Sequence, residues 1–184
     1  MKSVCVFLGS SPGKNPVYME AAKAMGQEIA RRGMTCVYGG SCTGLMDALA
    51  NSAMEAGGKV VGVTVQALKD KECHHKGLTE LHVVETMDER KKMMGELAEG
   101  FIALPGGIGT FEEFFEVCTL KQLGFHSKPC GLLDINDFYA PFDLLMGKAE
   151  DEGFMNYPHL KMIHRTESPA DMLDLMKAEA LQKK

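Results

Sequence analysis

The chain has 184 residues, of which 45% are apolar and 24% are charged, and its formal net charge is −5. This length suits one domain with a substantial core, and the apolar fraction argues against long disorder. The negative charge argues against a broad nucleic-acid-binding surface, because such a surface needs a basic field. A phosphorylated ligand would therefore need a local site.

Short apolar runs alternate along the chain with longer stretches of helical periodicity. The predicted strands are residues 4–9, 34–40, 59–65, 81–85, 101–107 and 129–134. The predicted helices are residues 16–32, 44–56, 87–99, 110–123, 138–153 and 169–180. A polar stretch, residues 66–79, follows the third strand.

This alternation predicts βαβ units and a parallel sheet. Apolar strands between helices fit a sheet that is covered on both faces. We therefore expect an α/β fold: a Rossmann-like, doubly wound parallel sheet with helices on both faces, in a single nucleotide-binding domain over residues 1–184. Ligands of such folds bind at the carboxyl ends of the strands.

Three loops at that edge are rich in glycine and serine, and each leads into a predicted helix. They are 9–16 (GSSPGKNP), 38–44 (YGGSCTG) and 105–110 (PGGIGT). Glycine lets the backbone approach a ligand closely, and a helix N-terminus offers free N–H groups and partial positive charge. Any one loop could be an ordinary tight turn, but three at one edge favour a nucleotide or sugar-phosphate site.

The familiar nucleotide-binding patterns are absent. In GSSPGKN the spacing to Lys14 is wrong for a Walker loop, and Asn15 replaces Ser or Thr. No Gly-x-Gly-x-x-Gly follows the first strand, so no dinucleotide cofactor is indicated. The GGSCTG segment does not match the nucleophile elbow of a hydrolase.

Two adjacent glutamates follow the third glycine loop. Thr110 and Glu113 have the spacing of a capping box, which is one interpretation of Glu113. Adjacent helical positions point about 100° apart, so Glu112 and Glu113 must have different roles. A carboxylate beside a bound phosphate is electrostatically costly, and such a cost tends to mark a functional group.

A cationic run begins the helix predicted at 87–99. Thr86 and Glu89 have capping-box spacing, and Arg90, Lys91 and Lys92 follow where the helix dipole disfavours cations. A solvated face would explain Lys92. An anionic ligand or the glutamate pair would explain Arg90 better, because a guanidinium pairs well with phosphate and carboxylate.

PGGIGTFEE resembles the Pro-Gly-Gly-x-Gly-Thr-x-x-Glu motif of the Lonely guy (LOG) family, cytokinin riboside 5′-monophosphate phosphoribohydrolases long mislabelled as lysine decarboxylases. GSSPGKNPVY, YGGSCTGLM and ERKKMM resemble its other blocks in the same order, from about Ser3 to Asp134. The resemblance implies that Arg90 and Glu113 are the catalytic pair, and that the PGGIGT turn holds the 5′-phosphate. The substrate-binding positions it implies are Gly9, Ser10, Gly40, Glu72, Lys91, Gly106, Gly107, Ile108, Gly109, Thr110, Phe111 and Glu112.

This implied chemistry agrees with the residue types. Cleavage of an N-glycosidic bond gives an oxocarbenium-like sugar, which a carboxylate can stabilise. We expect Glu113 to do so and Arg90 to orient it. The substrate would be an N6-prenylated adenosine 5′-monophosphate, AMP, or both. Ser41, Cys118 and Leu120 differ from the usual family residues, which leaves the base preference open.

The rival interpretation is a non-catalytic module that binds a nucleotide or molybdenum cofactor on the same fold. Such a module would not need the Arg90–Glu113 pair. A decarboxylase would need a Schiff-base lysine for pyridoxal phosphate. Lys128, in HSKP, lies in a predicted turn and lacks the usual Ser-x-His-Lys order, so we reject that activity.

The remaining expectations concern partners and location. We expect no cofactor and no metal site, since His74 and His75 are adjacent and no second ligand cluster is evident. The helices at 44–54 and 110–125 are apolar over more than one face, which predicts a homodimer. Six cysteines without a Cys-x-x-Cys pair, no signal peptide and no long apolar run predict a reduced, cytoplasmic protein that binds no membrane or nucleic acid.

Overall fold

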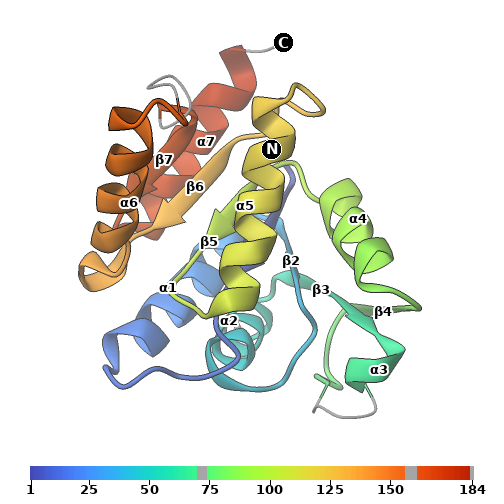
Figure 1. The fold of residues 1–184 in the computed structure, drawn as a ribbon. Coiled ribbons are helices and arrows are strands. Elements are labelled where there is room, and N and C mark those ends of the chain that lie inside the picture. The colour runs from blue at the N-terminus through green and yellow to red at the C-terminus, as the bar shows by residue number, and fades with distance from the viewer. Residues whose placement is uncertain (70–73, 156–160, 183–184) are drawn as a thin grey trace.

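The computed structural model describes residues 1–69, 74–155 and 161–182. Within them, one parallel sheet has the strand order β4-β3-β2-β1-β5-β6-β7 (Figure 1). Its strands are β1 (Ser3–Phe7), β2 (Thr35–Tyr38), β3 (Lys59–Val65), β4 (Glu80–Val84), β5 (Phe101–Ala103), β6 (Cys130–Leu133) and β7 (Ile163–Thr166). The α helices are α1 (Val17–Arg31), α2 (Gly44–Glu55), α3 (Gln66–Lys69), α4 (Met87–Leu97), α5 (Ile108–Gln122), α6 (Ala140–Asp151) and α7 (Pro169–Gln182).

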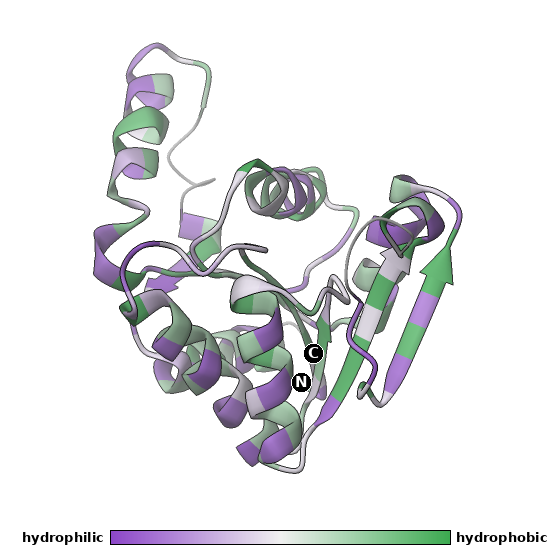
Figure 2. Ribbon diagram, turned by 90° about the horizontal axis from the view of Figure 1, so that it is seen from below, coloured by the Kyte–Doolittle hydropathy of each residue, from purple (hydrophilic) through white to green (hydrophobic). Residues whose placement is uncertain are grey.

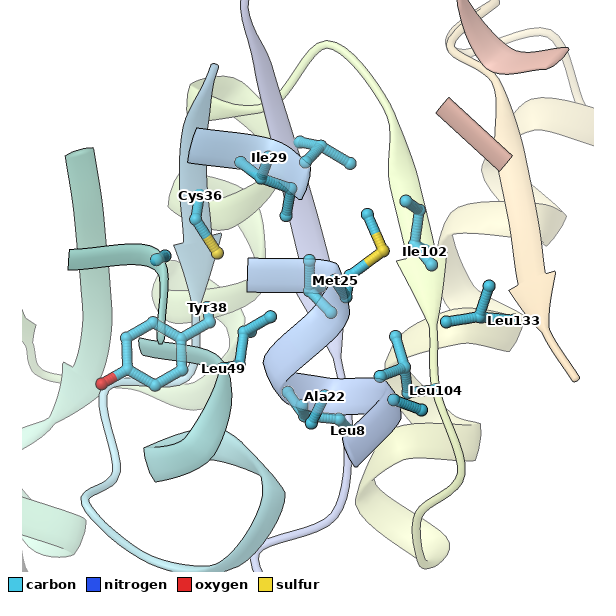
Figure 3. Packing of buried hydrophobic residues seen from close by; sticks show 14 of the residues in the cluster. Leu8, Ala22, Met25, Ile29, Cys36, Tyr38, Leu49, Ile102, Leu104 and Leu133 are labelled. Carbon is cyan, nitrogen blue, oxygen red and sulfur yellow. The ribbon is translucent and has the colours of Figure 1, made fainter. Parts of the chain in front are cut away.

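The predicted doubly wound α/β fold is confirmed. Alternate residues of β1 point to opposite faces of the sheet, as the period of a strand requires. Val4 and Val6 pack with α1, α2 and α7, whereas Cys5 and Phe7 pack with α4 and α5. Because both faces are covered, the strand is apolar and buried from Val4 to Phe7. Figure 3 shows the first of these two cores, with side chains of α1 between those of the strands.

Helices α1 and α2 pack closely against one another. A Cβ atom on Gly26 would lie 2.3 Å from Ser52 Oγ and 2.4 Å from the Leu49 carbonyl oxygen, so only glycine permits this approach. Most apolar residues of α2 are buried in the first core. The broad apolar surface of α2 is therefore covered by α1 and the sheet.

The sequence prediction missed β7 and the one-turn helix α3. Strand β7 pairs in parallel with β6 and forms an edge of the sheet. Its residues, IHRT, are partly exposed and mostly polar, so they lack the apolar run used to recognise the other strands. A short helix, η1 (Ile135–Asp137), also precedes α6.

Helix α6 stands away from the rest of the molecule (Figure 2). None of its residues is buried, although Leu144 and Leu145 are large and apolar. No helix in the described part of the chain is long and apolar enough to cross a membrane.

Candidate active site

The three glycine-rich loops meet at the carboxyl edge of β2, β1 and β5, which are neighbours in the sheet. The Gly9 N–H donates to the Pro105 carbonyl oxygen at 3.2 Å, and the Gly9 carbonyl oxygen accepts from the Leu45 N–H at 3.2 Å. The first loop is thus bonded to the PGG turn on one side and to the start of α2 on the other.

Helix α5 begins at Ile108, with Gly107 as its N-cap and no side-chain capping bond. The capping box read from Thr110 and Glu113 is therefore wrong, because the helix starts two residues earlier than predicted. Thr110 is buried in the first turn, where a Cβ atom on Gly106 would lie 2.2 Å from its Oγ1. The first N–H groups of α5 have no side-chain cap, which leaves them available to an anion.

The predicted capping box of α4 is confirmed. Thr86 Oγ1 accepts from the Glu89 N–H at 3.1 Å, and the Glu89 carboxylate accepts from the Thr86 N–H at 3.3 Å. This cap fixes the first turn of α4. The next residue, Arg90, consequently points into the protein, and its side chain is only 8% exposed.

Arg90 and Glu113 form a buried ion pair between α4 and α5. Arg90 Nη1 donates to Glu113 Oε1 at 2.7 Å, and Arg90 Nε donates to the Val63 carbonyl oxygen at 2.9 Å. A Cβ atom on Gly39 would lie 2.5 Å from Arg90 Nη2, so the glycine makes room for the guanidinium. The pair predicted from the sequence is brought into direct contact.

Burial raises the pKa of Glu113 above its ordinary value of 4.5, against the opposing effect of Arg90. The carboxyl side chain is 13% exposed, so its charged form loses most of its hydration. Arg90 stabilises that charge but does not fully replace the lost water. A carboxylate held at such a cost is typical of a functional site.

Glu112 has a different environment, as the 100° rotation between adjacent helical residues requires. Lys91 Nζ lies 2.5 Å from Glu112 Oε1 and 3.2 Å from Glu116 Oε2. The hydrogen bond to Glu112 raises the pKa of Lys91. Three charge pairs, one buried and two at the surface, therefore join α4 to α5.

A cavity of about 350 Å³ lies over this edge of the sheet and contains most of the predicted site residues. Those lining it are Gly9, Ser10, Arg90, Gly107, Ile108, Gly109, Thr110, Glu112 and Glu113. Gly106 lines an adjoining cavity of about 250 Å³, which shares Gly9, Ser10 and Gly107 with the first. The two cavities are thus adjacent, and residues of the first and third glycine loops line both of them.

Three predicted substrate contacts, Gly40, Phe111 and Lys91, line neither of these two cavities. Gly40 has a positive φ of 79°, and its carbonyl oxygen accepts from the His75 N–H. Phe111 lines an apolar cavity on the other side of α5. Lys91 is engaged by the two glutamates. Glu72 lies outside the described residues.

Eight residues that line the main cavity were not predicted as substrate contacts. Three of them, Val6, Phe7 and Leu8, lie at the end of β1, and the other five follow further along the chain. These five are Gly39, Ser41, Met46, Leu68 and Met87. Gly39 and Ser41 follow the end of β2, and Met46, Leu68 and Met87 lie in α2, α3 and α4 at the same edge. Their positions at this edge of the sheet were the signal that the sequence offered.

None of the described residues that line the main cavity is a cysteine or a histidine. Cys42 is disulfide-bonded, so the expectation of fully reduced cysteines is wrong there, while Cys5, Cys36, Cys118 and Cys130 are free. His75 Nε2 lies 2.9 Å from Asn51 Oδ1. Among the described residues, no group of three or more His, Cys, Asp or Glu side chains is placed to hold a metal ion.

A family model described as "Possible lysine decarboxylase" matches residues 46–176. A cytokinin riboside 5′-monophosphate phosphoribohydrolase of Rhodococcoides fascians is 51% identical over 155 residues, covering 84% of this chain and 78% of the relative. The chain belongs to the Lonely guy (LOG) family. A LOG protein of Arabidopsis thaliana with the same described activity is 38% identical, covering 95% of this chain and 82% of its own.

Solved structures outside the LOG relatives share the fold. A molybdenum cofactor binding protein from Rippkaea orientalis superposes with a TM-score of 0.72 at 20% identity, covering 97% of each chain. A molybdenum cofactor carrier protein from Chlamydomonas reinhardtii gives 0.72 at 21% identity, covering 100% of this chain and 99% of its own. At this identity the likeness concerns the fold alone.

Lys128 lies outside the main cavity, although the family description mentions lysine decarboxylase. Its Nζ donates to the Gly95 carbonyl oxygen at 2.7 Å and lies 5.7 Å from the centre of the Phe101 ring. The lysine is thus engaged between α4 and β5, away from the Arg90–Glu113 pair. This placement agrees with the rejection of a Schiff-base role.

Proposed function

We propose that this protein hydrolyses the N-glycosidic bond of adenosine 5′-monophosphates and releases the free base and ribose 5-phosphate. The observation that carries the proposal is the buried Arg90–Glu113 pair, which opens into a cavity beside an uncapped helix N-terminus. The activity named for the relatives at 38–51% identity supports the same reaction.

The 5′-phosphate would bind at the start of α5. Gly107 and Gly109 have open space where a Cβ atom would be, so a ligand can approach the backbone there. The free N–H groups and the helix dipole favour an anion at this end. Lys91 neutralises Glu112, which lowers the repulsion between that carboxylate and the phosphate.

Glu113 would act on the sugar. As the bond between C1′ and the base nitrogen breaks, its electron pair leaves with the base and positive charge develops on the ribose. The Glu113 carboxylate stabilises that charge in a site with little competing water. A water oxygen then bonds to C1′, and the proton released from water balances the charge of the departing base. Arg90 orients the carboxylate, since its own pKa is too high for proton transfer.

The base would lie against the apolar part of the cavity, where Met46, Leu68 and Met87 are found. This wall suits both an adenine ring and an N6-prenyl group, so both substrates remain in the proposal. Of the residues that depart from the family pattern, Ser41 lines the cavity, whereas Cys118 and Leu120 do not. Of these three residues, Ser41 is therefore the one that can contact the base directly within one chain.

We also propose that two copies associate through the α5–α6 face. An apolar cavity of about 370 Å³ lies there, lined largely by Phe111, Phe114, Phe115, Phe138 and Phe142. Leu144 and Leu145 beside it are 78% and 61% exposed. Contiguous apolar surface of this kind is typical of an interface between subunits. A cytoplasmic location would give such an enzyme access to nucleotides.

The decisive experiment is a chromatographic assay for base release from AMP and from isopentenyladenosine monophosphate. Adenosine serves as the control, because it lacks the phosphate and should be a poor substrate. Nucleotide binding without base release would favour the non-catalytic module. Efficient cleavage of adenosine would contradict the phosphate site.

A further inference from the structure

The turn that precedes α5 is held from two sides. On one side the Gly9 N–H donates to the Pro105 carbonyl oxygen. On the other, the Tyr139 hydroxyl donates to the Leu104 carbonyl oxygen at 2.7 Å, in a fully buried position. Leu104 follows the last residue of β5, so its carbonyl oxygen lies beyond the strand itself and takes a side-chain donor instead.

The Tyr139 ring also contacts the first turn of α5. Its centre lies 6.4 Å from that of Phe111 in an edge-to-face arrangement. Burial of the phenol raises its pKa, so the hydroxyl remains a donor. One side chain thus contacts both segments that would surround the phosphate: the turn through its hydroxyl and the helix through its ring.

Tyr139 is itself fixed by Asp134, at the carboxyl end of β6. Asp134 is 5% exposed, and its Oδ1 accepts from the Tyr139 N–H at 2.8 Å. Its other oxygen accepts from Arg165 of β7, at 2.9 Å from Nε and also through Nη2. The hydrogen bonds therefore run from an edge strand of the sheet to the PGG turn.

The loop between Asp134 and Tyr139 is strained. Asn136 and Asp137 have φ values of 55° and 53°, in the left-handed region that few residues other than glycine adopt. Such conformations persist only where the surroundings over-determine them, and they cluster at functional sites. The bond from the Tyr139 N–H to Asp134 spans the strained residues and keeps them in place.

We propose that Tyr139 is a positioning residue for the 5′-phosphate, which sets the PGG turn and the start of α5 through the Arg165–Asp134–Tyr139–Leu104 chain of hydrogen bonds. The inference rests on the phosphate site proposed above. Tyr139 lines neither the main cavity nor the adjoining one, so it acts through the backbone that it holds. Loss of its hydroxyl should weaken recognition of the phosphate and leave recognition of the nucleoside unchanged.

The test measures the dissociation constants of AMP and adenosine by calorimetry, in a Glu113→Gln background that slows turnover about a hundredfold. Tyr139→Phe should weaken AMP binding about fivefold to tenfold, because it leaves a buried carbonyl oxygen without its donor. Adenosine binding should not change. Ser52→Ala is the matched control, since it removes another buried hydroxyl that donates to a backbone carbonyl, 3.1 Å away and outside both cavities.

Arg165→Gln tests the outer end of the chain and leaves Tyr139 intact. It should also weaken AMP binding relative to adenosine binding, by a smaller factor than Tyr139→Phe does. If Tyr139→Phe does not fold, this variant decides: a lower preference supports the proposal, and an unchanged one overturns it. Equal losses for AMP and adenosine, or no loss for either in folded Tyr139→Phe, would also overturn it.

The two proposals can fail separately. If the Glu113→Gln protein with no other substitution binds AMP and adenosine equally, the phosphate site is wrong, and the positioning role is wrong with it. If it prefers AMP and Tyr139→Phe keeps that preference, only the positioning role is wrong.

Discussion

The two sides of α5 have opposite chemistry. Glu112 and Glu113 line the main cavity, whereas Phe111, Phe114 and Phe115 line the apolar cavity beside α6. Both sides come from the single run FEEFFE, in which residues three and four apart share a side of the helix. Charge is kept buried on one side at an energetic cost, and apolar surface is left exposed on the other. The first arrangement favours chemistry and the second favours association.

The largest expected effect is the loss of base release when Glu113, on the polar side of α5, is substituted. Glu113→Gln keeps the size of the side chain and an oxygen that can accept the Arg90 hydrogen bond, but removes the negative charge. Base release from AMP should fall about a hundredfold, or roughly 3 kcal/mol in the barrier. The variant should stay folded and bind AMP, as thermal melting and calorimetry would report. Normal turnover in a folded variant would rule out the proposed role of Glu113.

A smaller effect is expected from Gly107→Ala. Within the chain the new methyl group meets no atom within 4 Å, so the fold should be retained. The group would, however, crowd a ligand at the start of α5 and weaken AMP binding about tenfold. Gly95→Ala adds the same methyl group into open space outside both cavities, and should not alter binding. If the two variants bind AMP with equal affinity, AMP does not bind at this turn.

The role of the apolar side of α5 is tested by the oligomeric state of the protein. The wild type should scatter light as a dimer at micromolar concentration. Leu145→Glu should shift the equilibrium toward monomers, because it places a charge in the proposed interface. Leu181→Glu, on α7, is the control, since Leu181 and Leu145 are 63% and 61% exposed. If both substitutions dissociate the dimer equally, the interface has been placed wrongly.

The smallest effect concerns pH. The proposed reaction needs the Glu113 carboxylate, whose pKa is raised, so the rate should fall with decreasing pH at a midpoint above 4.5. Lys91 lowers this pKa and Glu112 raises it. Lys91→Met should therefore move the midpoint up, and Glu112→Gln should move it down. Shifts in the reverse directions would exclude Glu113 as the titrating group.

Stability should respond to pH in the opposite sense. A carboxyl group with a raised pKa in the folded state contributes stability that is fully present below its unfolded pKa. That contribution is lost as the pH rises through the folded value. Glu113 would thus favour folding where it is protonated and favour catalysis where it is ionised. Melting curves of wild type and Glu113→Gln across this range would separate its contribution from those of other groups.

The sequence was most informative where the local pattern and the packing agree. The apolar strands and the glycine loops at their carboxyl ends predicted the fold and most of the cavity. Strand β7 was missed because a polar edge strand has no apolar signature. The start of α5 was misplaced because threonine is common at the N-cap position, which favoured Thr110. In the structure Gly107 is the N-cap, and the helix begins at Ile108.

The distribution of side chains around α5 could not be predicted from composition. Phe111 lies within the binding motif, but its ring faces the apolar cavity. Met46 and Met87 have ordinary core chemistry, but they line the main cavity. Which side of a helix faces a ligand depends on the crossing of neighbouring elements, and that is a property of the assembled sheet.

Arg90 has a further consequence for thermal inactivation. Its guanidinium bonds to the Val63 carbonyl oxygen at the sheet, bonds to Glu113 on α5, and fits the space left by Gly39 of the second glycine loop. The same atoms would thus orient the carboxylate and tie four segments of the chain together. On heating, the ion pair cannot separate while these segments stay packed. We therefore expect heating to abolish activity and tertiary structure together, without a folded but inactive state between them.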